Sequence, residues 1–172
     1  KGFSTLRPNN YTADADKVVC NFRTSIREGE KNRIKSMLFG GFQKCLYPAQ
    51  KFDSDPERRF AVILENDENT LKWFKPAKGD FQIHYSHDAS YEPDFVVETT
   101  TGKFICEPKR ASEVSDNVVQ SKADAAAVWC KHATVHAKTY GGKPWTYLLI
   151  PHDQVSEQMS LAGLAARCTH VS

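Results

Sequence analysis

The sequence predicts an α/β fold in which a mixed central β-sheet is flanked by helices on both sides. Segments with helical spacing of apolar residues and short β-rich runs follow one another in the order helix, helix, three or four strands, helix, strand, helix. The run WTYLLIP at 145–151 is almost continuously apolar, which is typical of a strand covered on both faces. The 172 residues, 40% apolar and 26% charged, suit one globular domain rather than two.

The first part of the chain predicts a helix that follows a mixed, polar lead-in segment, residues 1–24. We expect the core of the domain to span 25–172 and the helix to span 25–42, ending near Gly40 and Gly41. The apolar positions of this helix are Ile26, Ile34, Met37, Leu38 and Phe42.

A second helix is expected to begin at Asp55 and Pro56. Proline fits the first helical position and disfavours a helical conformation in the residue before it, which suits Asp55 as the N-cap. Apolar side chains follow Glu57 after three, four and seven residues, so Glu57 shares the buried face of the helix. An acid in the first helical turn also favours the helix dipole by roughly 0.3–1 kcal/mol, which is a purely structural alternative for Glu57.

The rest of the chain predicts strands, a long helix, a further strand and a short helix. An Ala-rich packing face indicates the long helix from Asp116 to about Ala137, and the short helix is expected from Asp153 to Arg167. The expected strands are 71–74, 81–85, 94–100, 103–109 and 145–151.

The hairpin of the runs 94–100 and 103–109 carries charges that an apolar hairpin does not need. If a loop of two or four residues joins the runs, one face is uniformly apolar and is expected to be the core face. Asp94, Glu107 and Lys109 gather on the other face at one strand end, with Asp94 opposite either Glu107 or Lys109. The core-face residues are Phe95, Val97, Phe104 and Cys106.

Asp94 and Glu107 are therefore candidate ligands of a metal ion. Carboxylates on opposed residues, about 4.5–5.5 Å apart at Cβ, repel unless a proton or a cation lies between them. Mg²⁺ prefers such oxygens and keeps several waters, and Lys109 is placed to orient or deprotonate a water or to offset charge on a phosphate. Glu57 is a candidate for a further carboxylate. The structural alternative is an ordinary strand-start residue at Asp94 and solvated edge charges at Glu107 and Lys109.

The string Pro93-Asp94, twelve residues, then Glu107-Pro108-Lys109 resembles the PD-(D/E)XK signature of metal-dependent nucleases. Residues 40–152 resemble the C-terminal endonuclease domain of the type III restriction enzyme Res subunit and of related helicase-nuclease proteins. The segments that carry this resemblance are ERRFAVILE (57–65), LKWFKPAKGDFQIHY (71–85), YEPDFVVE (91–98), KFICEPK (103–109), KADAAAVWC (122–130) and GGKPWTYLLIP (141–151).

The resemblance implies a restriction-endonuclease-like core and Mg²⁺-dependent hydrolysis of double-stranded DNA, with Mn²⁺ as a substitute ion. It implies that Asp94 and Glu107 ligate the metal, with the Pro108 carbonyl as a candidate third oxygen. Lys109 would assist the attacking water, and Glu57 matches the helix-borne acid that completes the site in many members. The candidate contacts to the site or to the DNA backbone on the following helix are Gln120 and Lys122.

Pro108 departs from the family pattern, in which the middle position of the triplet is usually apolar or small. Proline removes a ladder hydrogen bond, so we expect either a bulge at the site or a ladder that ends before Pro108. This departure supports an alternative function, a catalytically inactive nuclease-fold domain used for DNA binding or protein docking.

The implied partners are double-stranded DNA, a helicase or translocase region of the same parent polypeptide, and a modification subunit as a further candidate. The chain has no G-x-x-x-x-G-K-[ST] phosphate loop, so the motor would lie elsewhere in the parent. A net charge of +2 does not establish a nucleic-acid partner. The residues expected to contact phosphates are Arg110, Lys122, Lys131 and Lys138.

The termini and the cysteines indicate a cytoplasmic protein without a membrane partner. The chain begins at Lys1 without the pattern of a signal peptide, so we expect a fragment excised from a larger protein. No run reaches the roughly 18 apolar residues of a membrane span. Five irregularly spaced cysteines disfavour a disulfide framework. Cys130, His132 and His136, like the pair Cys168 and His170, lack the spacing of structural zinc sites, so no zinc is expected and a zinc scaffold is a third alternative.

Overall fold

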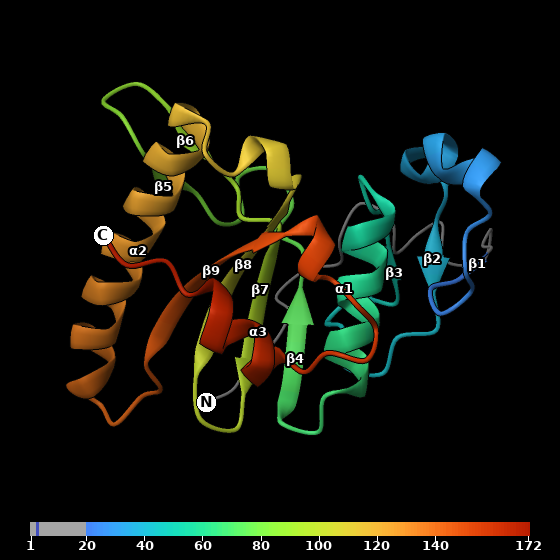
Figure 1. The fold of residues 1–172 in the computed structure, drawn as a ribbon. Helices are drawn as coiled ribbons and strands as arrows, with labels where there is room; N and C mark the ends of the chain where they lie inside the picture. The colour runs from blue at the N-terminus through green and yellow to red at the C-terminus, as the bar shows by residue number, and fades with distance from the viewer. Residues whose placement is uncertain (1–2, 4–19) are drawn as a thin grey trace.

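The computed structural model, which describes residue 3 and residues 20–172, has the predicted α/β architecture with a mixed sheet flanked by helices (Figure 1). The central sheet has the strand order β4-β7-β8-β9, in which only the β8–β9 pair is parallel. Its strands are β4 (Thr70–Phe74), β7 (Phe95–Thr99), β8 (Lys103–Lys109) and β9 (Trp145–Pro151).

Helices cover both faces of this sheet. Helix α1 (Asp55–Asn66) and helix α3 (Leu161–Cys168) share one apolar core with Phe95 and Cys106, whereas α2 (Asn117–Lys138) packs over Ile105 on the other face. None of the helices that the structure describes is both long and apolar enough to cross a membrane.

Short elements surround the central layers. A three-stranded sheet consists of β1 (Cys20–Asn21), β2 (Phe39–Gly40) and β3 (Ala49–Gln50), and a separate pair consists of β5 (Ile83–His84) and β6 (Ser90–Tyr91). The 3-10 helices are η2 (Glu28–Ser36), η3 (Ala111–Glu113) and η4 (His152–Gln154).

The hairpin parity is confirmed by the register of β7 and β8. Phe95 pairs with Cys106 and Glu98 with Lys103, so the loop has four residues. This register places Asp94 opposite Glu107 rather than opposite Lys109. The second face of the hairpin is nevertheless not a free surface, because Ile105 is buried under α2. On that face Glu98 is also buried, and its carboxylate accepts a hydrogen bond from Lys143 Nζ at 2.9 Å.

The expected helix over 25–42 is wrong in type and extent. The chain forms η2 and then the strand β2, because Ile34 is the one buried side chain of η2 and gives it only a narrow apolar face. Phe39, by contrast, is fully buried and pairs with Gln50 of β3, so tertiary packing selects an extended conformation there.

The start of α1 differs from the prediction by one residue. Ser54 is the N-cap, and its hydroxyl accepts a hydrogen bond from the Glu57 N–H at 3.4 Å. Asp55 instead accepts a hydrogen bond from Arg58 Nε at 2.8 Å inside the first turn. The prediction that Glu57 lies on the buried face is confirmed, since it is 5% exposed.

Three further segments differ from the expectations. The strand expected at 81–85 is reduced to β5, outside the central sheet, and the last helix begins only at Leu161 with Ser160 as its N-cap. The lead-in segment is not separate from the core, because Phe22 is fully buried. Residues 1–2 and 4–19 of that segment lie outside the described residues.

One buried carboxylate fixes α1 against the edge of the sheet. Glu65 accepts hydrogen bonds from Trp73 Nε1 in β4 at 2.9 Å and from the backbone N–H groups of Gln43, Lys44 and Cys45 at 2.9, 2.9 and 3.1 Å. Hydrogen bonds to an ionised, buried carboxylate are among the stronger ones in proteins. They hold α1, β4 and the loop before β3 in one arrangement.

We expect Glu65→Ala to lower the free energy of unfolding by about 2–4 kcal/mol, because four donors would lose their acceptor inside the fold. Urea unfolding followed by circular dichroism measures this loss. Glu68→Ala, at an exposed position three residues away, is the matched control and should change stability by less than about 0.5 kcal/mol. Equal losses in the two variants would contradict the role given to Glu65.

Candidate active site

Asp94 and Glu107 meet at one end of the β7–β8 hairpin. The Asp94 N–H donates a hydrogen bond to Glu107 Oε2 at 3.3 Å, and Glu107 is only 8% exposed. Burial raises the pKa of both carboxyl groups, and the negative charge of Asp94 raises the pKa of Glu107 further. Two charges are costly here unless a proton or a cation compensates them.

Glu57 joins this pair from α1. Its carboxylate accepts hydrogen bonds from the Asp53 N–H at 3.1 Å and from Lys75 Nζ at 2.6 Å. The charge of Glu57 also contributes to raising the pKa of Asp94. The side chain therefore faces the carboxylate pair rather than solvent, although it occupies the first helical turn.

Lys75 is the site residue that the sequence analysis missed. Its ammonium lies 4.6 Å from the ring centroid of Phe95 in addition to its ion pair with Glu57. Burial opposes its charge, but Glu57 and Asp94 more than compensate and raise the pKa of Lys75. The signal available in the sequence was parity, because Lys75 comes two residues after Trp73 and so shares its inward direction.

Lys109 lies at the end of β8 and belongs to the same charged cluster. Its positive charge lowers the pKa of Asp94 and of Glu107, in opposition to the larger effect of burial. The structure thus brings together the four predicted residues Glu57, Asp94, Glu107 and Lys109 and adds Lys75 to them.

Pro108 lies in a regular part of the sheet. Its pairing with Ile150, and that of Lys109 with Pro151, continue the β8–β9 ladder without a shift, so no bulge forms. On the other side, the pairing of β8 with β7 ends at Cys106. The Lys103 N–H points toward Pro144, which precedes β9. Because backbone N–H groups alternate in direction along a strand, the Pro108 nitrogen faces the β7 side. It lies beyond the last β7–β8 pair, so the proline costs no ladder hydrogen bond.

The ring of His152 in η4 lies near the Pro108 backbone. Burial lowers the pKa of His152, while the charge of Glu57 and the Pro108 backbone oppose this shift. A carbonyl oxygen has two lone pairs, so the Pro108 carbonyl keeps an acceptor position for a metal ion even beside this ring.

Three of the residues expected to contact DNA are in different surroundings. Arg110 is exposed and lies 3.7 Å from Glu113. The Gln120 amide donates to the Val114 carbonyl at 2.6 Å. Lys122 lies over the rings of Tyr85 and Tyr91, at 5.3 and 5.4 Å.

Tyr91 borders the site behind Glu107. Its hydroxyl donates to the Lys122 carbonyl at 3.3 Å, and its pKa is raised by burial and by the charge of Glu107. Tyr91 was absent from the sequence-based set, since an isolated tyrosine before a strand carries no pattern that predicts such a contact.

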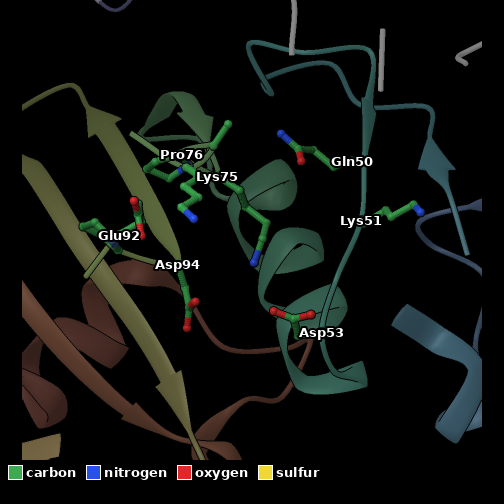
Figure 2. Close-up of a pocket in the computed structure, with 10 residues that line it drawn as sticks. Gln50, Lys51, Asp53, Lys75, Pro76, Glu92 and Asp94 are labelled. Carbon is green, nitrogen blue, oxygen red and sulfur yellow. The ribbon is translucent and has the colours of Figure 1, made fainter. Parts of the chain in front are cut away.

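A cavity of about 340 Å³ opens beside Asp94. Figure 2 shows Glu92 and Asp94 on its β7 side, with Gln50 and Asp53 on the opposite wall, in the segment that leads from β3 to α1. Lys75 and Pro76 belong to the same lining. The cavity gives a ligand access to Asp94 from outside.

The donor set fits Mg²⁺. Asp94 and Glu107 offer hard oxygen ligands that already need a compensating cation, and Mg²⁺ commonly uses one or two carboxylates and completes its shell with water. In the part of the chain that the structure describes, no three or more His, Cys, Asp or Glu side chains form a metal-binding group by themselves. Bound waters and the Pro108 carbonyl would therefore supply the other ligands.

The residues of the zinc alternative do not form one group among the described residues. Cys130 lies on the buried side of α2, and burial raises the pKa of its thiol to about 12. His132 and His136 are exposed on the same helix. His170 lies 2.7 Å from Asp124 through its ring Nε2.

Comparison with known proteins gives no relative, since no family model and no curated protein matches the chain. The assignment of this site thus depends on its geometry and on the resemblance of its motif.

We expect the metal-free protein to lose stability as the pH rises from about 5 to about 8. The raised pKa of Glu107 means that the folded state binds more protons than the unfolded state in this window, so deprotonation favours unfolding. Glu107→Gln should flatten this dependence and, in EDTA near pH 8, raise the free energy of unfolding by on the order of 1 kcal/mol. Urea unfolding at the two pH values measures both effects.

Glu68→Gln is the control for that experiment, because Glu68 is exposed. It should retain the pH dependence of the unchanged protein. If Glu107→Gln retained the pH dependence as well, the destabilising effect of a buried charge at Glu107 would be refuted.

We expect Lys75→Met to destabilise the protein by about 3–5 kcal/mol, because Glu57 would be left as an unpaired buried charge. Glu57→Gln should recover a large part of this loss in the double variant. Urea unfolding of the two single variants and the double variant gives the coupling energy. Additive losses would contradict a direct ion pair.

Proposed function

We propose that this chain is a Mg²⁺-dependent endonuclease domain that hydrolyses phosphodiester bonds of DNA. The observation that supports this function is the pair of the half-buried Asp94 and the buried Glu107 at the end of two adjacent strands, with Lys109 beside it. Paired carboxylates next to an ammonium are suited to hydrolysis of a phosphate ester, in which negative charge must be both tolerated and compensated.

The residues of the candidate site have the following roles in the proposed reaction. Asp94 and Glu107 would hold the ion, which when bound lowers the pKa of a water and polarises a phosphoryl oxygen. Lys109 would orient the attacking water or offset the charge that develops on the phosphate. Glu57 would complete the acidic site and is itself held by Lys75 and by the Asp53 N–H.

The proposed context is a restriction-type helicase-nuclease. The helicase or translocase region would lie in the same parent polypeptide, and a modification subunit is a candidate partner. Selection of the target sequence would belong to those parts, because the chain shows no motif of a base-reading helix module.

The second candidate is an inactive nuclease-fold domain that binds DNA or a protein. In the sequence analysis this candidate was supported by Pro108. Pro108 no longer supports it, because the β8–β9 register is regular and the proline costs no ladder hydrogen bond. The ion pair of Lys75 with Glu57 still favours it to a degree, since an internal cation already neutralises one of the acids.

Plasmid cleavage in Mg²⁺ or Mn²⁺ separates the two candidates. We expect Asp94→Ala and Lys109→Ala each to lower the cleavage rate by roughly 100-fold or more, because each removes a group that acts only at the reacting phosphate. Glu68→Ala is the control and should cleave at the unchanged rate.

A calorimetric Mn²⁺ titration complements the cleavage assay, since an isolated domain can bind metal even where it cleaves slowly. Glu107→Gln should abolish uptake of the ion. Equal cleavage by all variants, or Mn²⁺ uptake that does not need Glu107, would refute the catalytic assignment.

A further inference from the structure

A second hollow, of about 380 Å³, lies on the other side of Asp53 from the cavity beside Asp94. Four basic side chains from three separate segments contribute to its lining: Lys31 and Lys35 of η2, Arg59 of α1, and Arg110 after β8. Asp53 lines both hollows. Since the Asp53 N–H donates to Glu57, the two hollows flank the acidic site.

The basic groups of the second hollow are available to an anion. The ion pairs of Lys31 with Glu28 and of Arg110 with Glu113 are solvent-exposed, at 2.6 and 3.7 Å, and such pairs contribute little to stability. A phosphate can therefore replace the carboxylate partner at small cost. Arg59 differs, because its guanidinium donates to the Val155 carbonyl at 2.8 Å and lies 3.3 Å from the carboxylate of Asp55, so it is held in place and already paired.

The first cavity contributes an unused donor. Gln50 is 3% exposed, and its Nε2 has no oxygen acceptor among the described residues. Its side chain lies close enough to the Cys45 thiol, a weak acceptor, to lower the pKa of that thiol. Figure 2 shows the Gln50 side chain directed from β3 across the cavity, toward the side of Lys75 and Pro76. A buried N–H group without an acceptor is unfavourable, and a phosphate oxygen would satisfy it.

We propose that η2 and the segment from Gln50 to Asp53 form a binding surface for the sugar–phosphate backbone of duplex DNA, which continues on both sides of the carboxylate site. This inference rests on the proposed nuclease function, because the reacting phosphate must lie at Asp94 and Glu107 with its neighbours to either side. Duplex DNA is the partner that fits, since its phosphates repeat along a line and need no base-specific contact here.

Apart from Arg110, the surface differs from the contacts expected from the sequence. Lys131 and Lys138 lie on α2, which Figure 1 shows on the opposite side of the sheet from η2, drawn in blue. Moreover, η2 lies outside residues 40–152, the stretch that resembles restriction nucleases. The proposal therefore assigns phosphate binding by Lys31 and Lys35 to a part of the chain outside that stretch, whereas Arg110 and the segment from Gln50 to Asp53 lie inside it.

Fluorescence anisotropy with a labelled DNA duplex in EDTA tests this surface without cleavage. Lys31→Ala/Lys35→Ala should weaken binding about tenfold and reduce the slope of log K against log salt by about two. Lys131→Ala/Lys138→Ala makes the same change of charge at two exposed positions of α2 and should leave affinity and slope unchanged. Gln50→Met, which keeps the volume but removes the donor, should weaken binding several-fold.

The outcomes separate this surface from the proposed reaction. If the α2 variant lost affinity and the η2 variant did not, the surface would be overturned even where the protein cleaves DNA. If the η2 variant lost affinity while Glu107→Gln bound DNA normally and the unchanged protein did not cleave, the surface would stand and the nuclease function would fail. Thermal melts of the variants show whether they fold, and the exposure of Lys31 and Lys35 favours intact folding.

Discussion

The pairing of Phe95 with Cys106 is the contact on which the candidate site depends. Strands β7 and β8 are covered by apolar residues on both faces, so a slip by one residue would exchange the two sets of side chains and leave cavities under α1 and α2. The core therefore dictates that Asp94 lies beside Glu107, although the two carboxylates repel each other. Burial elsewhere in the sheet sustains an unfavourable local arrangement, as is common where structure serves chemistry.

The sequence predicted those features that are encoded by nearby residues. The period-two pattern of 94–109 was sufficient for the hairpin parity, and the bounds of β8 and β9 agree with the prediction. For β9 the reason is its almost continuously apolar run. The inward direction of Glu57 followed in the same way from helical spacing.

Features that depend on partners distant in the chain could not be predicted. Lys75 is part of the site because Glu65 and Trp73 hold β4 against α1, and parity with Trp73 indicates an inward direction for Lys75 but not its partner Glu57. The helix predicted before α1 was wrong for a similar reason. The segment η2 has a narrow apolar face, and the conformation at Phe39 is fixed by packing rather than by helix preference. At the start of α1, two neighbouring residues could both serve as the N-cap, and the structure has Ser54 rather than Asp55 in that position.

The ion pair of Lys75 with Glu57 has a consequence for the order of events in the maturation of the protein. The chain carries its own counter-charge for one acid, and protons can neutralise the remaining pair of carboxyl groups while the pKa of each is raised. Folding on the ribosome then does not have to wait for a divalent ion. The ion would enter a finished domain by displacing protons, which ties its loading to the acidity of the surroundings rather than to chain synthesis.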